Sequence, residues 1–461
     1  NFVNFRLYLN FTVLRVNMTE IRNDIKKNRL SEKEYSENFG EIHPPFNKHE
    51  ALVEGDRCYY CYDAPCIDAC PTGINIPLFI RQITSGNPEG AAKTIFDENI
   101  LGGMSARVCP TETLCQEACV RNTGEDRPVK IGLLQRYATD TLMEAKEHPY
   151  KREKTNGKRI AIVGGGPAGL SCAHRLAMKG YSITIFDSKK KLGGLNEYGI
   201  AAYKSLENFA ERETKFVLSI GGIEHKLNST LGKDITLEEL QNDYDAVFLG
   251  LGLSGVNHLR LEGENSEAID DAVNYIEDLR QSQNLADLPV GRKVVVIGGG
   301  MTAIDMAVQI KKLGSEEVTI VYRRGQKDMS ASIEEQQNAQ NNGVLIRHWS
   351  KPSKLLINEK TVNGVEFEYT ENKNGKLVAT GEKFSIKADM VFRAIGQTFE
   401  SSIDNLPKLE NGRILVDNNY KTTVSGIWAG GDCVKDGEDL TVSAVEAGKI
   451  AANSIHNELV S

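Results

Sequence analysis

The sequence predicts an α-helical amino-terminal domain followed by α/β domains, each with a doubly wound parallel sheet. Three features of the 461 residues support this prediction. Seven of the nine cysteines fall between Cys58 and Cys119, where the surrounding pattern is helical. Two units of strand, glycine turn and helix then follow, RIAIVGGGPAGLSCAHRLAM and KVVVIGGGMTAIDMAVQI. Such units are typical of parallel sheets covered by helices, so a cysteine-rich helical domain precedes two α/β domains.

The composition is that of a globular protein and excludes several classes of function. Charged residues make up 26% and hydrophobic residues 40% of the chain. The net charge of −8 argues against a nucleic-acid-binding surface, which needs clustered lysine and arginine. No apolar run reaches the ~18 residues of a transmembrane helix. We therefore expect neither a nucleic acid nor a membrane partner, and a cytoplasmic location.

The amino-terminal part predicts an extension and then helices. Residues 1–17 precede the first methionine, Met18, and lack the cleavage site of a signal peptide. We expect residues 1–30 to be a disordered extension and residues 31–150 to form the helical domain. One helix is expected over NIPLFIRQITSGN, where Asn75 can cap the first turn and Pro77 fits within it. Another begins near Ile131, where apolar residues recur with helical period.

The remaining residues predict two α/β domains, one of them discontinuous. The polar segment 148–158 is typical of a linker. We expect residues 157–285 and 392–461 to form one domain around the first glycine loop. Residues 286–391 would form the other around the second loop, with β-hairpins between Trp349 and Asp389, where short alternating stretches occur.

The first glycine loop has the sequence of a dinucleotide-binding turn. It follows the strand RIAIV and opens a helix, so backbone N–H groups at the helix start can bind a pyrophosphate. An acidic residue about twenty positions later is expected to bind a ribose hydroxyl, and Asp187 ends the next strand at that place. The alternative is an ordinary glycine turn, which would need neither the strand, nor the helix, nor the acidic residue. The loop residues are Gly164, Gly165, Gly166, Pro167, Ala168 and Gly169.

The second loop has the related pattern G-x-G-x-x-A. Its candidate binding residues are Gly298, Gly300, Thr302 and Ala303. The strand after it ends in Arg323 and Arg324 in place of an acid. A guanidinium can pair with the 2′-phosphate of NADP(H), whereas a carboxylate would repel it. The alternative is that both arginines are solvated surface charges.

Together these loops and the carboxyl-terminal motifs resemble the two-dinucleotide-binding flavoprotein superfamily. The further motifs are LGGL at 192–195 and GIWAGGDC at 426–433. The resemblance implies FAD at the first loop and an exchangeable NAD(P)H at the second. It assigns Gly194, Leu195, Gly431, Asp432 and Thr441 to FAD. Relatives often carry arginine near FAD where this chain has Lys204, which keeps the charge but not the bidentate fork. The segment ADMVFRAIG implies that Ala394, Ile395 and Gly396 lie near the nicotinamide.

The cysteine spacing favours iron–sulfur clusters. The first run is Cys58-x2-Cys61-x4-Cys66-x3-Cys70-Pro, and the second is Cys109-Pro-x4-Cys115-x3-Cys119. A closing C-x3-C-P is typical of two-cluster ferredoxins, in which the last cysteine of a run binds the other cluster. Structural zinc favours paired C-x2-C units or histidines, and no histidine lies between the first and last of these cysteines. Disulfides are typical of short secreted chains. Seven thiols are one ligand short of two clusters with four ligands each.

The cysteine region resembles the amino-terminal domain of the dihydropyrimidine dehydrogenase family. The similar segments are GDRCYYCYDAPCIDACPTGINIPLFIR, ARVCPTETLCQEACV and VKIGLLQRYATD. In that family a glutamine completes the second cluster, and Gln135 stands at that position. The resemblance implies a crossed pattern of two [4Fe-4S] clusters. One would bind Cys58, Cys61, Cys66 and Cys119, and the other Cys70, Cys109, Cys115 and Gln135. The alternative for Gln135 is an ordinary helix residue.

The resemblance implies an electron-input subunit of the bacterial two-subunit enzyme. NAD(P)H would reduce FAD, and the clusters would carry electrons to a partner subunit in a hetero-oligomer. That partner would carry FMN and iron–sulfur clusters and reduce uracil or thymine at the 5,6 bond. We name no catalytic side chain, because hydride transfer depends on the cofactors. Ser330 stands where NADP-using relatives have another arginine, which favours NADH. The alternatives are the related glutamate synthase small subunit and a stand-alone diaphorase.

Overall fold

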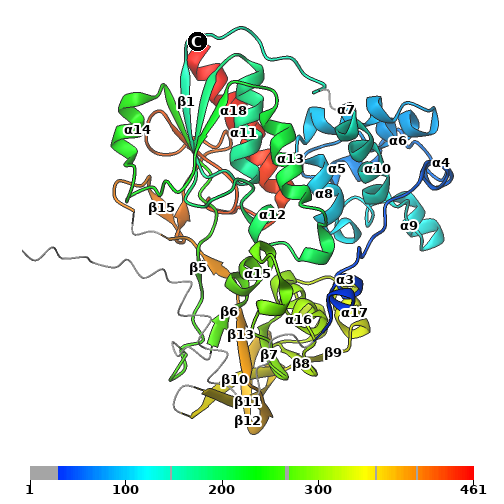
Figure 1. Ribbon diagram of the computed structural model, residues 1–461, viewed down its shortest axis with the longest axis vertical. Coiled ribbons are helices and arrows are strands. Elements are labelled where there is room, and N and C mark those ends of the chain that lie inside the picture. Colours follow the sequence, from blue (N-terminus) through cyan, green and yellow to red (C-terminus); the bar gives the residue numbers. More distant parts are fainter. Residues whose placement is uncertain (1–29, 146–147, 265–268, 359–360, 401–402, 461) are drawn as a thin grey trace, which may run out of the picture. The chain divides into compact units, whose positions relative to one another are not determined.

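The computed structural model describes residues 30–145, 148–264, 269–358, 361–400 and 403–460 (Figure 1). The expected extension, apart from Leu30, lies outside these residues. The described chain forms two compact units. The larger unit contains Glu41–Gly255 and the described part of Gln397–Ser461. The smaller unit contains the described residues up to Gly40 together with Val256–Gly396.

The amino-terminal half of the larger unit is helical, as the sequence predicts. Its helices are α4 (Lys48–Gly55), α5 (Pro65–Asp68), α6 (Ile76–Thr84), α7 (Pro88–Glu98), α8 (Gly102–Val108), α9 (Val120–Glu125) and α10 (Ile131–Glu144), with the 3-10 turn η1 (Thr111–Thr113). The two helices expected from the sequence are present as α6 and α10. The side chain of Asn75 accepts a hydrogen bond from the backbone N–H of Leu78 over 3.1 Å. This cap begins α6 at the expected residue, and the helix buries its apolar face.

A parallel five-stranded sheet forms the other half of the larger unit. Its order is β17 (Ile427–Ala429), β4 (Ala246–Leu249), β1 (Arg159–Val163), β2 (Ser182–Phe186) and β3 (Ile223–Lys226). Helices α11 (Pro167–Met178) and α18 (Thr441–Val460) lie side by side against one face, and α14 (Leu237–Asp243) lies on the other (Figure 1). The remaining elements are α12 (Leu195–Tyr198), η2 (Ala202–Lys204), α13 (Phe209–Leu218), β15 (Leu409–Glu410) and β16 (Arg413–Ile414).

The helical half and the sheet half share one hydrophobic core. Buried side chains of α6, α7 and α10 belong to the same cluster as those of α11 and α18. At the junction, the rings of Phe96 in α7 and Phe216 in α13 lie 5.1 Å apart. Helix α18 packs so closely on α11 that a Cβ on Gly448 would come within 2.1 Å of the carbonyl oxygen of Ala168. The cysteine region is therefore held directly against the first glycine loop's domain.

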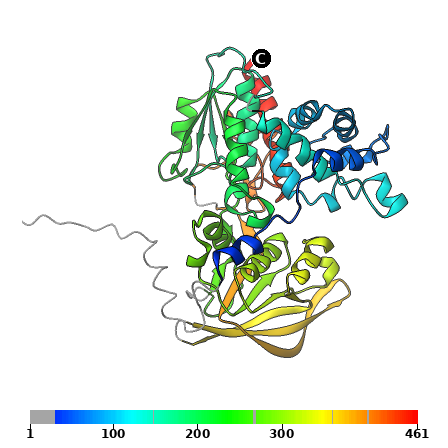
Figure 2. The same cartoon turned by 45° about the vertical axis from the view of Figure 1, so that its right-hand side comes forward.

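The smaller unit contains a second parallel sheet. Its order is β6 (Ile269–Asp271), β13 (Met390–Ala394), β7 (Lys293–Gly298), β8 (Glu317–Val321) and β9 (Val344–Arg347). Its helices are α3 (Glu32–Asn38), α15 (Ala272–Gln281), α16 (Met301–Lys312) and α17 (Ile333–Asn341), with the turns η3 (Leu285–Asp287) and η4 (Gln326–Asp328). The hairpins expected from the sequence are present as β10 (Ser350–Asn358), β11 (Thr361–Lys373) and β12 (Lys376–Lys387). These antiparallel strands form a separate layer beside the parallel sheet (Figure 2).

The boundaries of the units differ from the expected domain boundaries. The chain passes between the units at β5 (Gly255–Val256) and β14 (Gln397–Thr398), whereas the sequence suggested 285 and 392. The difference arises because β6 pairs with β13 and brings α15 with it. Helix α3 also belongs to the smaller unit, where the side chain of Asn38 donates to the carbonyl oxygen of Lys312 over 2.9 Å.

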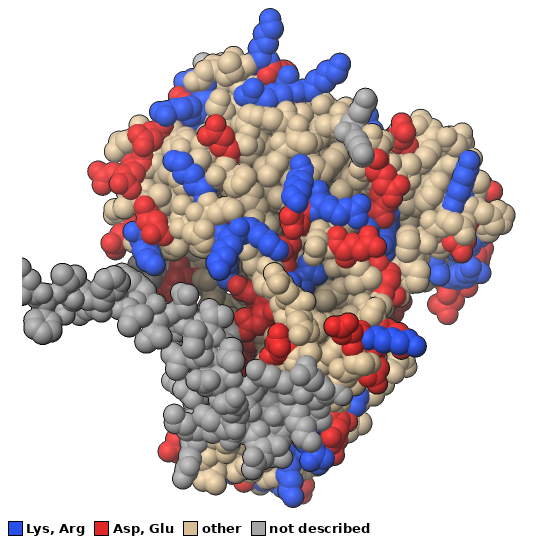
Figure 3. All heavy atoms as spheres, in the orientation of Figure 1, with Lys and Arg blue, Asp and Glu red and all other residues tan. Residues whose placement is uncertain are grey.

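The surface carries both signs of charge. On the face drawn in Figure 3, acidic and basic side chains are interspersed, with no extended basic stripe. Within the described residues, no helix combines the length and apolarity needed to span a lipid bilayer.

Candidate functional site

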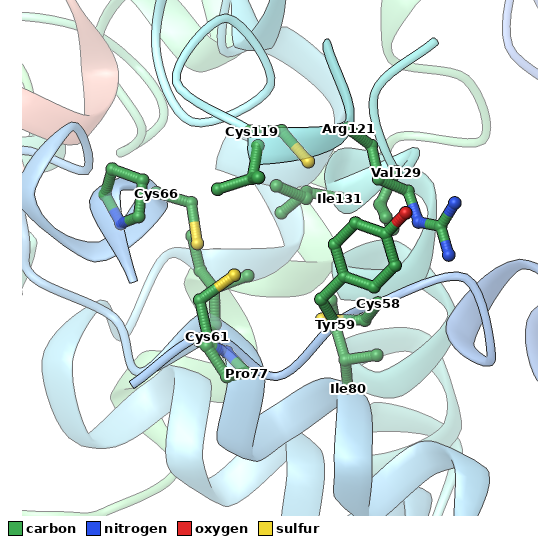
Figure 4. A pocket seen from close by; sticks show the side chains of 13 residues that line it. Cys58, Tyr59, Cys61, Cys66, Pro77, Ile80, Cys119, Arg121, Val129 and Ile131 are labelled. Atoms are coloured by element: carbon green, nitrogen blue, oxygen red, sulfur yellow. The ribbon is translucent and has the colours of Figure 1, made fainter. Parts of the chain in front are cut away.

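Four thiols line one pocket of the larger unit, and we call them the first thiol group: Cys58, Cys61, Cys66 and Cys119. They come from the loop before α5, from α5 itself and from the residue that begins α9. The walls are apolar and include Ile76, Pro77 and Ile80. In Figure 4 the sulfur atoms of Cys61, Cys66 and Cys119 face one common space. These are the four residues that the family resemblance assigns to one cluster, and the fold brings them to one pocket.

Burial disfavours the thiolate form in the first thiol group. It raises the pKa of Cys66 to about 12, with a further contribution from the neighbouring thiols of Cys58 and Cys119. Burial raises the pKa of Cys58 as well. A metal centre removes this cost, because a coordinated thiol is deprotonated outright. Four thiols around one apolar pocket therefore fit a cationic cluster that takes four thiolates.

Disulfides and zinc are the alternatives for these thiols. All nine cysteines are free. In the part of the chain that the structure describes, no three His, Cys, Asp or Glu side chains close around a single metal ion. Zinc needs such a tight set, because its bonds to sulfur are about 2.3 Å long. In an iron–sulfur cubane each thiolate binds a different iron atom, so the sulfur ligands stand further apart.

Three further cysteines form a second thiol group: Cys70, Cys109 and Cys115. Burial raises the pKa of Cys109 to about 12, and the thiol of Cys70 is the next cause. Burial, followed by the thiols of Cys109 and Cys70, raises the pKa of Cys115 well above its ordinary value. Cys70 follows α5, and Cys109 directly follows α8. The two runs of the sequence are thus crossed, with Cys119 in the first group and Cys70 in the second.

Gln135 lies in α10, where its side chain is buried. Its Nε2 donates to the carbonyl oxygen of Gly102, the first residue of α8, over 2.7 Å. This hydrogen bond places Gln135 against the helix that ends next to Cys109. Because the amide nitrogen is used in this way, Oε1 is the atom that could act as a metal ligand.

The first glycine loop connects β1 to α11 as expected. Gly164 has φ of +102°, and a Cβ there would come within 2.1 Å of the carbonyl oxygen of Gly250. Only glycine fits this turn. Gly166 directly precedes α11 and provides no side-chain cap, so the first N–H groups of the helix can bind an anion. The backbone N–H of Gly165 donates to Oδ2 of Asp187 over 2.7 Å, and burial raises the pKa of that carboxyl group.

Most other residues assigned to FAD lie around this loop. A Cβ on Gly194 would come within 2.7 Å of Cα of Gly166, and a Cβ on Gly431 within 3.1 Å of Cβ of Ala168. Asp432 follows β17, and burial raises its pKa to about 7. Leu195 begins α12 next to Gly194 and is exposed.

The other two residues assigned to FAD are Thr441 and Lys204. Thr441 begins α18, and its hydroxyl donates to Oδ1 of Asn196 over 2.7 Å. Asn196 is buried beside LGGL and was not singled out from the sequence, although its place directly after that motif was the available signal. Lys204 ends η2. Its charge lowers the pKa of His43, after the larger effect of burial, so Lys204 lies near that ring.

The second glycine loop connects β7 to α16 in the smaller unit. A Cβ on Gly298 would come within 2.1 Å of the carbonyl oxygen of Ala394, so the ends of β7 and β13 meet. Gly300 begins α16 without a side-chain cap, and a Cβ there would come within 3.1 Å of Oγ of Ser330. From the sequence, Ser330 was expected to matter only because it lacks the charge of an arginine. Thr302 and Ala303 lie in the first turn of α16.

The remaining expected residues of the smaller unit lie at the carboxyl ends of its strands. Arg323 and Arg324 follow β8 and are exposed. Ile395 and Gly396 follow β13, and both of their carbonyl oxygens accept from Nδ2 of Asn257, over 3.3 and 3.1 Å. Ligands of open parallel sheets bind at this edge.

Two family models match the chain. Residues 158–448 match the pyridine nucleotide-disulphide oxidoreductase family. Residues 35–147 match the dihydropyrimidine dehydrogenase domain II, 4Fe-4S cluster family. The chain is therefore an oxidoreductase with a 4Fe-4S cluster domain and an FAD/NAD(P)-binding part, as the sequence predicts.

Several full-length relatives are similar. The NAD-dependent dihydropyrimidine dehydrogenase subunit PreT of Salmonella typhimurium is 35% identical over 421 residues, which is 91% of this chain and 97% of the relative. PreT of Escherichia coli is 36% identical over 421 residues, again 91% of this chain and 97% of the relative. The glutamate synthase [NADPH] small chain of Escherichia coli is 34% identical over 447 residues, or 91% of this chain and 94% of the relative.

Solved structures share the fold of the α/β part. Mycobacterium tuberculosis FprA in complex with NADPH has a TM-score of 0.57 at 18% identity, covering 66% of this chain and 84% of that chain. Thioredoxin reductase of T. acidophilum has a TM-score of 0.52 at 23% identity, covering 66% and 100%. With the full-length relatives, these findings confirm the resemblance noted in the sequence: the chain belongs to the family of PreT-type NAD-dependent dihydropyrimidine dehydrogenase subunits, which is related to the glutamate synthase small chain.

Proposed function

We propose that this chain oxidises NADH and delivers the electrons, through FAD and two [4Fe-4S] clusters, to a partner subunit that reduces uracil or thymine at the 5,6 bond. The observation that carries the proposal is the arrangement of the seven thiols. They fall into two groups within the compact unit that also contains the first glycine loop. A chain that only transferred hydride would need no such groups.

The proposed ligand sets follow the two thiol groups. The first cluster would bind the four thiols of the pocket. The second would bind the thiols of Cys70, Cys109 and Cys115 together with Oε1 of Gln135. The two groups lie next to each other in this crossed arrangement. The thiol of Cys66 in the first group therefore also contributes to the raised pKa of Cys115 in the second. Adjacent clusters suit the transfer of single electrons.

Residues of the first loop would hold FAD. The free N–H groups at the start of α11 would bind its pyrophosphate, and the buried carboxylate of Asp187 would accept from a ribose hydroxyl. Gly194, Leu195, Gly431, Asp432 and Thr441 would line the rest of the site, and Lys204 would supply a nearby positive charge. Bound FAD would supply the change from two-electron to one-electron transfer, and these residues would supply its binding and orientation.

Residues of the smaller unit would bind the nicotinamide dinucleotide. The start of α16, with Gly298, Gly300, Thr302 and Ala303, would bind the pyrophosphate. Ala394, Ile395 and Gly396 would lie near the nicotinamide. Arg323 and Arg324 would suit the 2′-phosphate of NADPH. The PreT relatives are named NAD-dependent, however, and we therefore propose NADH as the physiological donor.

The proposed partner is a subunit that carries FMN, iron–sulfur clusters and the pyrimidine site. The PreT relatives are named as subunits, and this chain covers 97% of their length. We therefore propose that the chain forms a hetero-oligomer with this partner. Cluster thiolates need a reducing compartment, which supports a cytoplasmic location.

Anaerobic titration with NADH tests the proposal. We expect the flavin absorption to bleach and a paramagnetic cluster signal to appear, with iron and labile sulfide bound to the chain. Addition of the FMN-containing partner should then give NADH-dependent consumption of uracil. Protein that contains zinc and no sulfide would contradict the proposal.

The glutamate synthase small chain is a second candidate, favoured by 34% identity over 91% of this chain. The same reduced protein can be mixed with a glutamate synthase large subunit. Glutamate formation with that partner, and no uracil reduction with the FMN subunit, would select this candidate. Reduction of dyes alone, with neither partner active, would select a diaphorase.

A further inference from the structure

Helix α13 lies between the flavin loop and the second thiol group. On one side, Thr214 approaches the motif LGGL, because a Cβ on Gly193 would come within 3.7 Å of its hydroxyl oxygen. On the other side, Phe209 and Glu213 reach α8, the helix that ends directly before Cys109. Helix α13 therefore contacts both the LGGL motif of the proposed flavin site and the first turn of α8, the helix that leads to Cys109.

Glu213 makes the polar part of the contact with α8. Its side chain is 1% exposed, and Oε1 accepts from the backbone N–H of Met104 over 2.9 Å. Burial raises the pKa of this carboxyl group to about 8. Met104 belongs to the first turn of α8, which has no side-chain cap from its own segment. A carboxyl oxygen at this place accepts from one of the N–H groups that the start of a helix leaves without a partner.

Gly103 in α8 leaves room for the side chain of Glu213. A Cβ on Gly103 would come within 2.8 Å of Oε1 of Glu213 and within 2.7 Å of the ring of Phe209. A side chain at this position would therefore displace the ring of Phe209 and the carboxyl group of Glu213 from α8. Glycine at position 103 therefore leaves room for the contact between α8 and the side chains of Phe209 and Glu213.

Helix α10 also contacts α8, through Gln135 and Asp140. Gln135 donates to the carbonyl oxygen of Gly102. Arg107 donates to the carbonyl oxygen of Gly103 over 3.0 Å, pairs with Asp140 at 2.8 Å and lies over the ring of Phe209, with Cζ 3.4 Å from the centroid. Helix α8 is thus fixed from two directions, and the proposed ligands Cys109 and Gln135 share its position.

We propose that Glu213 is a positioning residue for electron transfer: by binding the first turn of α8, it fixes the second thiol group relative to the flavin-binding loop. This inference rests on the proposed function, because it assumes that the two sites exchange electrons. Glu213 touches neither site directly and acts through α8 and α13. Removing its carboxyl group leaves the buried N–H of Met104 without this acceptor, so α8 must shift or admit water.

Rapid mixing of the anaerobic, cluster-loaded chain with NADH tests the proposal. The variants are Glu213→Gln, which is isosteric but carries an amide NH2 in place of one carboxyl oxygen, and Glu213→Ala. Glu211→Gln is the matched control, because that side chain lies on the same helix and is largely solvated. In the Glu213 variants we expect flavin bleaching at the wild-type rate and reduction of the clusters slowed about tenfold or more. The control should match the wild type in both steps.

Two readouts separate positioning from general instability. The paramagnetic signal of one cluster should change in Glu213→Gln while the other cluster's signal stays unchanged. Hydrogen exchange of residues 101–109 should accelerate in the variants, also in chain that holds no iron. Normal exchange, or normal cluster reduction in both variants, would overturn the proposal. Absence of any cluster signal in the wild type would instead refute the proposed function, and hydrogen exchange in the iron-free chain would still decide the role of Glu213.

Discussion

Lys449 and Thr72 join α18 to the loop of the second thiol group: Nζ of Lys449 donates to the carbonyl oxygen of Thr72 over 3.1 Å. The hydroxyl of Thr72 lies 3.4 Å from the sulfur of Cys70. The same ammonium group pairs with Glu98 and Glu446, both at 2.7 Å. Its side chain is only 13% exposed, so these interactions are weakly screened.

Replacement of this lysine should therefore destabilise the larger unit. Lys449→Met leaves two carboxylates without their shared cation and a carbonyl oxygen without its donor, which should lower the free energy of unfolding by about 1–3 kcal/mol. Chemical denaturation of the anaerobic protein measures this. Lys215→Met, at a pair whose lysine is 71% exposed, should cost at most ~0.5 kcal/mol. Equal effects of the two substitutions would show that the Lys449 contacts are unimportant.

The crossed thiol groups predict that neighbouring cysteines serve different clusters. Cys66→Ser and Cys119→Ser should weaken the same paramagnetic signal, although these residues are far apart in the sequence. Cys70→Ser should weaken the other signal, although it lies only one helical turn from Cys66. The measurement is iron content together with the cluster spectrum of anaerobically prepared protein. Cys172→Ala, at a buried thiol in α11, should leave both unchanged. Loss of one signal by both Cys66→Ser and Cys70→Ser would refute the crossed assignment.

Gln135 should matter for the second cluster alone. Gln135→Leu keeps a side chain of similar size but removes both Oε1 and the donor to Gly102, whose carbonyl oxygen is then left without this partner. We expect the spectrum of the second cluster to change or disappear and that of the first to persist. Gln116→Leu is the control, since its oxygen accepts only a long 3.3 Å bond from the N–H of Gly132. An unaltered second cluster would show that Gln135 is an ordinary helix residue.

The glycine loops could be predicted because their signals are local. Strand, turn, helix and acid follow one another between Arg159 and Asp187, and the structure brings Gly165 and Asp187 into hydrogen-bond contact. The thiol groups needed the family resemblance, since spacing alone does not say that Cys119 belongs with Cys58. Folding then brings these residues to one pocket because α9 lies beside the loop before α5.

The contacts between the two halves of the larger unit could not be predicted. Met104 and Glu213 are 109 positions apart, and Thr72 and Lys449 are 377 apart. In the sequence, Gly102 and Gly103 suggest only a turn, and Glu213 looks like one charge among several in a surface helix. Their roles depend on which helices the shared core brings together. The same applies to β6, because its three residues form a strand only through their pairing with β13.

The exposed arginines after β8 predict how the chain distinguishes the two nicotinamide donors. Arg323→Ala and Arg324→Ala should raise the KM for NADPH about tenfold or more, because a 2′-phosphate loses a charge-assisted partner. The KM for NADH should change less than about twofold, since NADH has no group at that position. Flavin bleaching under anaerobic conditions measures both. Equal changes for the two donors would show that the arginines are solvated charges without a role in selection.

Asp432 predicts a pH dependence of the flavin-free chain. Burial, then repulsion from Asp439, raises the pKa of its carboxyl group to about 7 despite the opposing charge of Arg413. The ordinary value is near 3.8, so between about pH 4 and pH 7 the folded state binds more protons at this group than the unfolded state does. Stability contributed by this group therefore falls as the pH rises through that interval.

Asp432→Asn removes the titration and keeps the shape of the side chain. Relative to this variant, the wild-type chain without flavin should lose stability from pH 4 to pH 7, as chemical denaturation at several pH values would measure. Bound FAD should reduce the difference if its hydroxyl groups donate to the carboxylate, because such donors stabilise the charged form. Parallel pH profiles of wild type and variant without flavin would show that the carboxyl group titrates normally, and that solvent reaches it in the flavin-free protein.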